Sequence, residues 1–129
     1  MAEALSIASA NGALQTLREM QFRLELQMCW IAGAGASTKD IARKLGLAQA
    51  AISQDVLDAI ADGFARTAED TDADGRKLLI PGPLARARIH QWAELILRFT
   101  EEHYPNEVDV TFANVSASLR EVDAMQRVS

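Results

Sequence analysis

Cysteine, proline and aromatic residues are scarce in this chain of 129 residues. Its one cysteine, Cys29, excludes an internal disulfide framework, and no charged segment followed by an apolar run opens the chain as a secretory signal would. No apolar stretch approaches the roughly 20 residues that span a bilayer, because Arg18, Glu19, Arg23 and Glu25 interrupt the most apolar region. We therefore expect a cytoplasmic protein without a membrane partner.

Signatures of enzymes and metal sites are also missing from the sequence. There is no G-x-S-x-G, no P-loop and no H-E-x-x-H, and neither His90 nor His103 has a cysteine or carboxylate at ligand spacing. The acidic run at 70–75 resembles the start of a calcium loop, but Pro81 stands where that loop needs its bidentate glutamate. We expect a non-enzymatic protein with no catalytic residue, no metal site and no cofactor.

Length and composition predict a single, mostly α-helical domain over 1–129. Apolar residues make up 49% of the chain, which is enough for one core. The formal net charge is −5, but eight basic and eight acidic residues balance between Thr38 and Arg88. The acidic excess therefore lies outside that segment, which leaves room for a locally basic face.

Apolar residues at helical spacing predict an N-terminal helical region over 12–35. We expect its buried face to be formed by residues at alternating helical steps, widened by neighbouring apolar residues. The stripe consists of Leu14, Leu17, Leu24, Met28 and Ile31, and the neighbours are Phe22, Leu26, Cys29 and Trp30.

Two helices joined by a tight turn are predicted over 38–62. Ser37 or Thr38 can cap the first helix, and Gly46 permits the turn. The second helix is expected to bury residues spaced four apart, which are Ile52, Val56 and Ile60.

A β-hairpin is predicted over 64–80, with strands at Phe64–Glu69 and Lys77–Ile80 around a turn-rich segment. A long helix is then predicted over 83–104. Its apolar stripe is too long for so small a core to cover and predicts a dimer interface formed by Ile89, Trp92, Ile96 and Phe99. The tail over 106–129 is predicted to be only partly helical.

This order of elements is typical of a winged helix-turn-helix domain with a two-stranded β-wing and flanking dimerisation helices. In that architecture the second helix of the pair enters the major groove of DNA, and the wing touches the neighbouring backbone or minor groove. The predicted contacts from the first helix and the wing are Thr38, Lys39, Arg43, Lys44 and Lys77.

The segments 38–53 and 72–77, with Gly63 between them, resemble the MarR family of transcriptional regulators, and the likeness covers about 22–99. The resemblance implies a homodimer built from N- and C-terminal helices, a palindromic duplex DNA target, and commonly repression relieved by oxidation or a small-molecule effector. It also implies contacts to bases or the minor groove by Gln49, Ala50, Ser53, Gln54 and Arg76.

Two alternatives keep the same fold. An acidic face around Asp55, Asp58 and Asp62 would suit a protein–protein interaction module with a basic partner. A cavity between the dimer helices and the winged core would suit a redox or small-ligand sensor. Cys29 is interpreted as a core residue, because no cationic neighbour is evident in the sequence.

Overall fold

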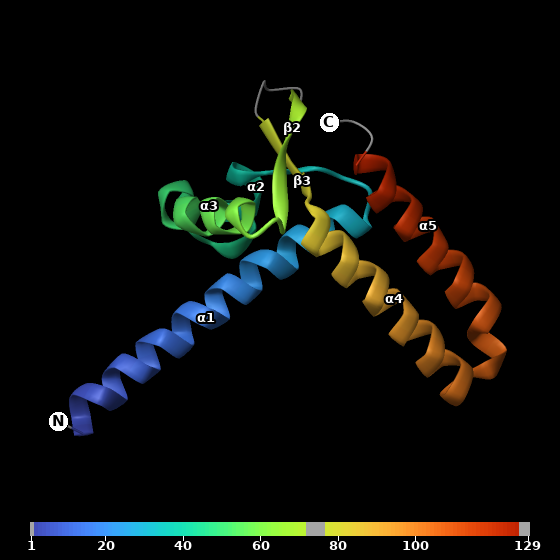
Figure 1. The fold of residues 1–129 in the computed structure, drawn as a ribbon, viewed down its shortest axis with the longest axis horizontal. Helices are drawn as coiled ribbons and strands as arrows, with labels where there is room; N and C mark the ends of the chain where they lie inside the picture. The colour runs from blue at the N-terminus through green and yellow to red at the C-terminus, as the bar shows by residue number, and fades with distance from the viewer. Residues whose placement is uncertain (1, 72–76, 127–129) are drawn as a thin grey trace.

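Helices make up most of the chain, and a small three-stranded antiparallel sheet lies between them (Figure 1). The computed structural model describes residues 2–71 and 77–126, and the side chains of 16–68 and 77–125. In chain order the elements are α1 (Ala2–Ile31), β1 (Ala36–Ser37), α2 (Thr38–Leu45), the 3-10 helix η1 (Gln49–Ile52), α3 (Ser53–Ala61), β2 (Ala65–Thr71), β3 (Lys77–Pro81), α4 (Pro83–His103), the 3-10 helix η2 (Pro105–Glu107) and α5 (Val108–Gln126).

The sheet has the order β1-β3-β2, so that β3 is its central strand. Strands β2 and β3 form the expected hairpin, in which Arg66 lies opposite Ile80 and the register shifts between Thr67 and Thr71. The short strand β1 was not predicted. It is only two residues long, and its pairing with β3 defines it, whereas its own sequence has no strand pattern.

Local signals set the boundaries of the α2–α3 pair. The Ser37 hydroxyl caps α2 by accepting a hydrogen bond from the Asp40 amide at 3.1 Å. Gly46 ends α2 with a φ of 70°, a left-handed conformation that favours glycine. The second helix of the predicted pair begins as the 3-10 turn η1 and continues as α3. Ala48 precedes η1 and has no side chain that could cap it, which favours the tighter first turn.

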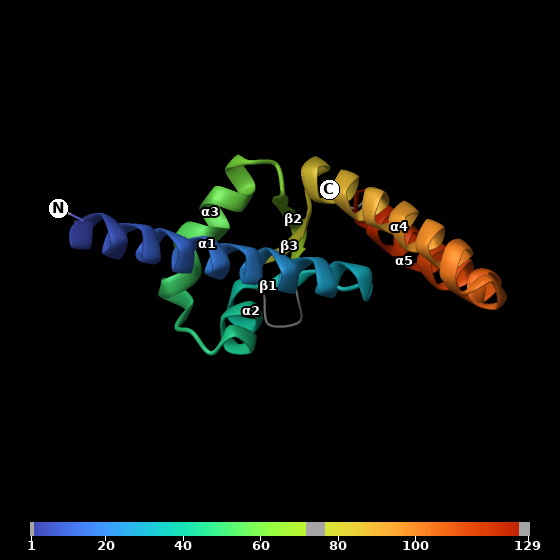
Figure 2. The same cartoon turned by 90° about the horizontal axis from the view of Figure 1, so that it is seen from below.

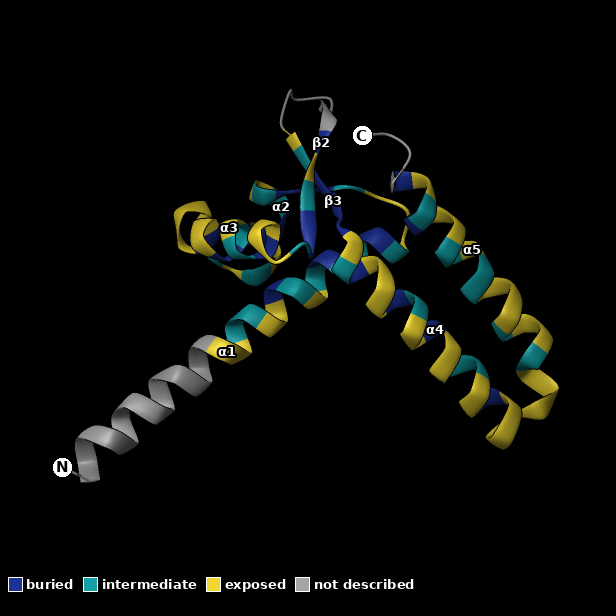
Figure 3. Ribbon diagram, in the orientation of Figure 1, coloured by how far each residue is buried: buried dark blue, intermediate teal, exposed yellow. Residues whose placement is uncertain are grey.

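One buried cluster joins residues from both ends of the chain. Phe22, Leu26 and Trp30 of α1 are fully buried in it, and the Trp30 and Phe64 ring centroids lie 5.6 Å apart. The Trp30 indole donates a hydrogen bond of 3.0 Å to the Leu79 carbonyl of β3. Figure 3 shows that burial is concentrated where α1, the sheet and the start of α4 meet.

The predicted buried face of α1 is wrong in part. Leu17, Leu24 and Met28 of the predicted stripe are exposed, whereas the residues expected only to widen it form the core face, which carries Phe22, Leu26 and Trp30. The helix has apolar residues on two opposite faces, and the face with the large aromatic rings meets the sheet. The helix also begins earlier than position 12 and ends at Ile31, before Gly33 at a φ of 89°. The side chain of Leu14 lies outside the described residues.

The predicted buried face of α3 is also wrong in part. Ile52 is fully buried and Val56 is partly buried, but Ile60 is exposed. Asp55 and Ala59 are the buried residues of α3 itself. A step of four residues overshoots one turn of an α-helix by about 40°, so Ile60, two such steps after Ile52, lies about 80° away from the direction of Ile52.

Helices α4 and α5 form an antiparallel hairpin that leaves the sheet on the side opposite to the free end of α1 (Figures 1 and 2). Pro83 stands in the first turn of α4, as predicted. The tail, expected to be partly helical, is the continuous helix α5 over Val108–Gln126. Its far end is anchored because Val122 and Met125 are buried in the core cluster.

Candidate nucleic-acid interface

Helix α2 presents a cluster of basic side chains to solvent. Lys39, Arg43 and Lys44 are exposed on it, whereas Thr38 at its first position is half-buried. Arg43 forms an ion pair with Asp40 one turn away, and this contact neutralises part of its charge. The two lysines are therefore the strongest candidates for phosphate contacts on α2.

The start of the second helix carries the predicted base-contacting residues on its exposed side. Gln49, Ala50, Ser53 and Gln54 are all exposed, within η1 and the first turn of α3. The Ser53 hydroxyl donates a hydrogen bond of 3.4 Å to the Gln49 carbonyl. These four predicted residues are thus brought together on one accessible surface.

The hairpin contributes one described cation of the predicted set. Lys77, the first residue of β3, is exposed, while Arg76 lies outside the described residues. Helix α3 contacts β2, so the hairpin stands beside the helix pair (Figure 1).

Two acidic residues in and just after α3 pair with arginines of α1. Asp55 is only 3% exposed, and its carboxylate lies 3.3 Å from the Arg18 guanidinium of α1. Asp62, just past the end of α3, forms an ion pair with Arg23 of α1. Each of these two carboxylates therefore has a positive partner within the chain.

The third acidic residue of α3 constrains a predicted base-contacting residue. The Gln54 amide donates a hydrogen bond of 2.9 Å to the Asp58 carboxylate one turn later. A glutamine that reads adenine uses both its amide donor and its carbonyl acceptor. The amide nitrogen carries two N–H groups, so the bond to Asp58 occupies one of them and restrains the orientation in which Gln54 can offer the other to a base.

Arg18 and Arg23 are the residues that the sequence-based prediction missed. They are separated from their aspartates by 37 and 39 positions, and helical spacing gives no signal for a contact at that distance. Arg23 also lies over the Phe64 ring, 5.0 Å from its centroid. Because Arg23 contacts both the Asp62 carboxylate and the Phe64 ring, it links α1 to the segment at the end of α3.

The predicted dimer-interface residues divide between the core and the surface. Ile89 is 4% exposed and packs in the core of its own chain, so it has almost no surface to offer a partner. Ile96 is half-buried, while Trp92 and Phe99 are more than half exposed. Leu95, which was not predicted, is exposed beside them. We call the exposed set Trp92, Leu95 and Phe99 the α4 stripe.

Helix α1 carries a second exposed apolar face, which consists of Leu17, Met20, Leu24 and Met28. We call this set the α1 stripe. Its members are spaced three or four residues apart and stand on the side of α1 opposite to Phe22 and Leu26. Four large apolar residues in a row are more than the scattered exposure that is ordinary for a soluble surface.

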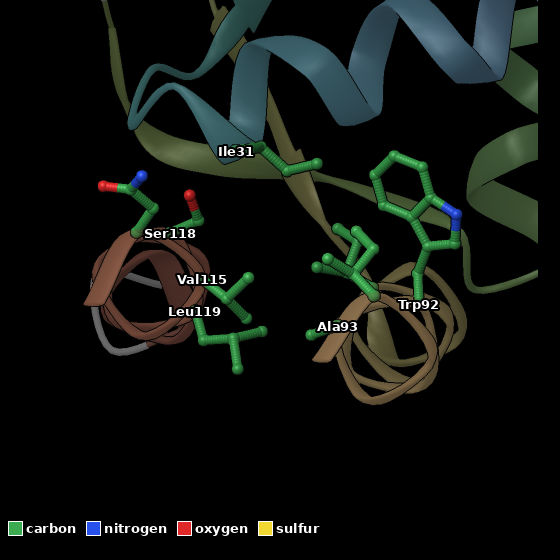
Figure 4. Close-up of a pocket in the computed structure, with 9 residues that line it drawn as sticks. Ile31, Trp92, Ala93, Val115, Ser118 and Leu119 are labelled. Atoms are coloured by element: carbon green, nitrogen blue, oxygen red, sulfur yellow. The ribbon is translucent and has the colours of Figure 1, made fainter. Parts of the chain in front are cut away.

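A small cleft lies where the end of α1 meets the α4–α5 hairpin. Its volume is about 140 Å³, and among its lining residues the Ile31 side chain of α1 points toward Trp92 of α4 (Figure 4). Its walls are largely apolar, with Asn114 and Ser118 of α5 as the polar exceptions. Ile31 also follows Met28 on the same side of α1, so the cleft joins the α1 stripe to the α4 stripe.

Cys29 differs from its predicted environment. It is only partly buried, and the Lys44 ammonium lies 3.4 Å from its sulfur, although no cationic neighbour was expected. The contact joins α1 to α2 and was hidden by a separation of 15 positions.

Within residues 2–71 and 77–126, no helix combines the length and the apolar character that crossing a membrane requires. Among the same residues, no three histidine, cysteine or carboxylate side chains cluster as metal ligands would. Comparisons with protein-family models, with curated proteins and with solved structures find no match for this chain.

Proposed function

We propose that the chain is a dimeric, non-enzymatic transcriptional regulator that binds duplex DNA through a winged helix-turn-helix, as its resemblance to MarR regulators implies. In this proposal α2 and α3 are the helix pair, and β2 and β3 are the wing. The chain order of helix pair, hairpin and long helix supports it, as does the packing of the hairpin against α3.

The observation that carries the proposal is the pairing of Asp55 and Asp62 with arginines of α1. Three aspartates on the second helix would repel phosphates if all of them faced outward. Two have internal positive partners, and the exposed start of the helix is uncharged. A surface with Lys39 and Lys44 beside it can therefore approach DNA without strong repulsion.

The proposed contacts follow from the exposed residues. Gln49, Ser53 and Gln54 enter the major groove, where glutamine can pair with adenine and serine can serve bases or phosphates. Lys39 and Lys44 bind phosphates on one side of that groove. Lys77 of the wing contacts the neighbouring backbone.

The alternative of an acidic docking face would use carboxylates that already have partners within the chain. Asp55 is buried and Asp62 is already paired, so that Asp58 is the one aspartate of the three without an arginine partner among the described residues. A basic partner would have to displace existing ion pairs to use the other two carboxylates.

A second copy of the chain is the proposed partner for the α4 and α1 stripes. The α1 stripe lies on one of the two arms that diverge below the sheet in Figure 1 and the α4 stripe on the other, and the cleft lined by Ile31 and Trp92 joins them. A two-fold dimer would set its recognition helices about 34 Å apart, one turn of DNA. The joining cleft is the candidate site for a small-molecule effector.

The experiment that tests the proposal is a salt titration of DNA affinity by fluorescence anisotropy. Replacing Lys39 and Lys44 by alanine is expected to reduce the slope of log K against log salt by about 1.8, because each lost phosphate contact contributes about 0.9. The control replaces two other exposed cations, Arg88 of α4 and Arg120 of α5. Equal slopes for the two double variants would remove α2 from the interface.

A further inference from the structure

The Arg18–Asp55 pair is the one ion pair of the described residues that places a carboxylate in the protein interior. Asp55 is 3% exposed, whereas the Arg18 side chain is 41% exposed. One Asp55 oxygen accepts a hydrogen bond of 3.4 Å from Arg18, and the other accepts none from any residue that the structure describes. The carboxylate therefore depends on Arg18 for compensation of its charge.

A carboxylate at this position is not needed for packing. Asp55 lies on the buried side of α3, as does Ala59. A small apolar residue at position 55 would be buried without the free-energy cost of removing a charge from water. A buried ion pair has one property that apolar contacts lack, because it is satisfied in few orientations. It therefore restricts how α3 can lie against α1.

A second link restrains the other end of the same helix. Asp62 follows α3 directly and pairs with Arg23, and Arg23 also stacks on Phe64. The two links are separated by the length of α3 and both originate from α1. Together they oppose rotation of α3 about its own axis as well as tilting of its end.

Rotation matters because the predicted base-contacting residues lie on the exposed side of the helix, away from Asp55 and Ala59. Each residue advances an α-helix by about 100°, so a slip of one position would turn Ser53 and Gln54 away from their surface. Direct base contacts depend on such orientation, whereas attraction between lysines and phosphates does not.

We propose that Arg18 is a positioning residue for DNA sequence recognition. By fixing Asp55 to α1, it sets the orientation of α3 that presents Gln49, Ser53 and Gln54 to base edges. The proposal rests on the proposed function. Helix α1 also carries the α1 stripe, which is the proposed contact with a second copy of the chain. The same helix therefore holds both α3 and the second copy in this proposal.

The test removes both charges, so that no uncompensated carboxylate remains in the interior. The variant is Arg18→Gln with Asp55→Asn, and its matched control is Arg86→Gln with Asp123→Asn, which removes the ion pair between α4 and α5. Wild-type protein first selects a preferred duplex from a random pool. Anisotropy then gives the ratio of affinities for the selected and random duplexes.

The Arg18–Asp55 double variant is expected to lose at least tenfold in this ratio while its affinity for random duplex stays within about twofold. The control variant keeps the wild-type ratio, and Arg18→Lys, which retains the charge, recovers part of the loss. A general loss of stability would lower both affinities together. An unchanged ratio in the double variant would overturn the proposal.

Amide hydrogen exchange without DNA separates this proposal from the proposed function. Faster exchange of the α3 amides over 53–61, with α4 unchanged, is expected in the Arg18–Asp55 variant. If the wild-type protein binds no duplex but the variant still shows this faster exchange, DNA binding is refuted, while the role of Arg18 in holding α3 against α1 stands. Unchanged exchange in α3 would refute the fastening itself.

Discussion

At the scale of single residues, the contacts that a charged side chain makes decide its role more than the sign of its charge does. Asp55, Asp58 and Asp62 are identical side chains on one short segment, yet one is buried against Arg18, one holds Gln54 and one pairs with Arg23. Only Asp58 both remains near the proposed DNA surface and restrains a residue that would read a base.

We expect Asp58→Asn to increase DNA affinity by about two- to tenfold at low salt. The substitution removes one negative charge near phosphates and weakens the acceptor that holds the Gln54 amide. Anisotropy at several salt concentrations measures the change. Asp109→Asn, an exposed residue at the start of α5, is the charge-matched control and is expected to have a smaller effect.

The two tryptophans allow a second comparison between residues of one type. Trp30 is fully buried and donates a hydrogen bond to the Leu79 carbonyl, whereas Trp92 is 56% exposed. Trp30→Phe loses volume and leaves that carbonyl without its partner, and we expect it to lower the free energy of unfolding by about 2–3 kcal/mol. Trp92→Phe leaves the core of the single chain intact and is expected to lower the free energy of unfolding by less than Trp30→Phe does.

Urea unfolding followed by circular dichroism gives both values, at a protein concentration held constant across the variants. Equal effects of the two substitutions would contradict the placement of Trp30 in the core and of Trp92 at the surface.

At the scale of elements, a small cluster of charged and polar side chains links α4 to α5 within their hairpin. Asp123 of α5 accepts hydrogen bonds from Arg86 at 2.8 Å and from His90 at 3.0 Å, both on α4. Burial alone would raise the pKa of the Asp123 carboxyl. The hydrogen bonds and charges of Arg86 and His90 outweigh burial and lower that pKa below its ordinary value of 3.8.

The lowered pKa predicts how the stability of this hairpin depends on pH. As pH falls, the unfolded chain takes up the proton before the folded chain, so the contribution of Asp123 is present above pH 3.8 and is lost below it. Asp123→Asn should therefore destabilise the protein at pH 7 by well under about 1 kcal/mol, because the pair is partly exposed.

Thermal unfolding of wild type and Asp123→Asn between pH 2.5 and 7 tests this dependence. The difference in melting temperature is expected to shrink as the pH falls through the folded-state pKa. A difference that is constant across this range would exclude the charge of Asp123 as its cause.

Local signals were enough to predict elements that depend on neighbouring residues. The cap from Ser37 and the turn at Gly46 involve contacts within a few positions, and both are confirmed. The tail was predicted to be only partly helical because its start, Val108 to Phe112, alternates as a strand would, whereas the structure has a continuous helix whose far end is anchored by Val122 and Met125.

Contacts between distant elements were beyond sequence reasoning. Helix α1 has two apolar faces, and spacing alone cannot decide which one the sheet will cover. The ion pairs of Arg18 and Arg23 likewise join positions more than 35 residues apart. The exposed side of the proposed recognition helix could be predicted, but the pairing of its carboxylates could not.

At the scale of the whole molecule, two helices each carry an exposed row of large apolar side chains. The α1 stripe and the α4 stripe together contain seven large side chains, each more than half exposed. Because they meet at the cleft between Ile31 and Trp92, one partner could cover both. A second copy of the chain is the partner that the proposed function requires.

We expect Leu24→Glu to convert a wild-type dimer into a monomer without unfolding it. Leu24 is 53% exposed, so a charge there leaves the core intact but opposes burial against a partner. Size-exclusion chromatography with light scattering gives the mass, and circular dichroism reports the helices. The control is Ala117→Glu on the exposed side of α5, which should remain dimeric.

A wild-type protein that is monomeric at micromolar concentration would contradict the assignment of these stripes to a second copy. A Leu24→Glu variant that remains dimeric would remove the α1 stripe alone from the interface and leave the α4 stripe as its basis.

Equilibrium titration of the wild-type protein with a random duplex, in dilute buffer and again at raised salt, tests the central claim most directly. The exposed lysines of α2 and the internally paired aspartates of α3 predict measurable binding at low salt that weakens steeply as salt is added. Absence of binding to any duplex at low salt would contradict DNA recognition by α2, α3 and the hairpin.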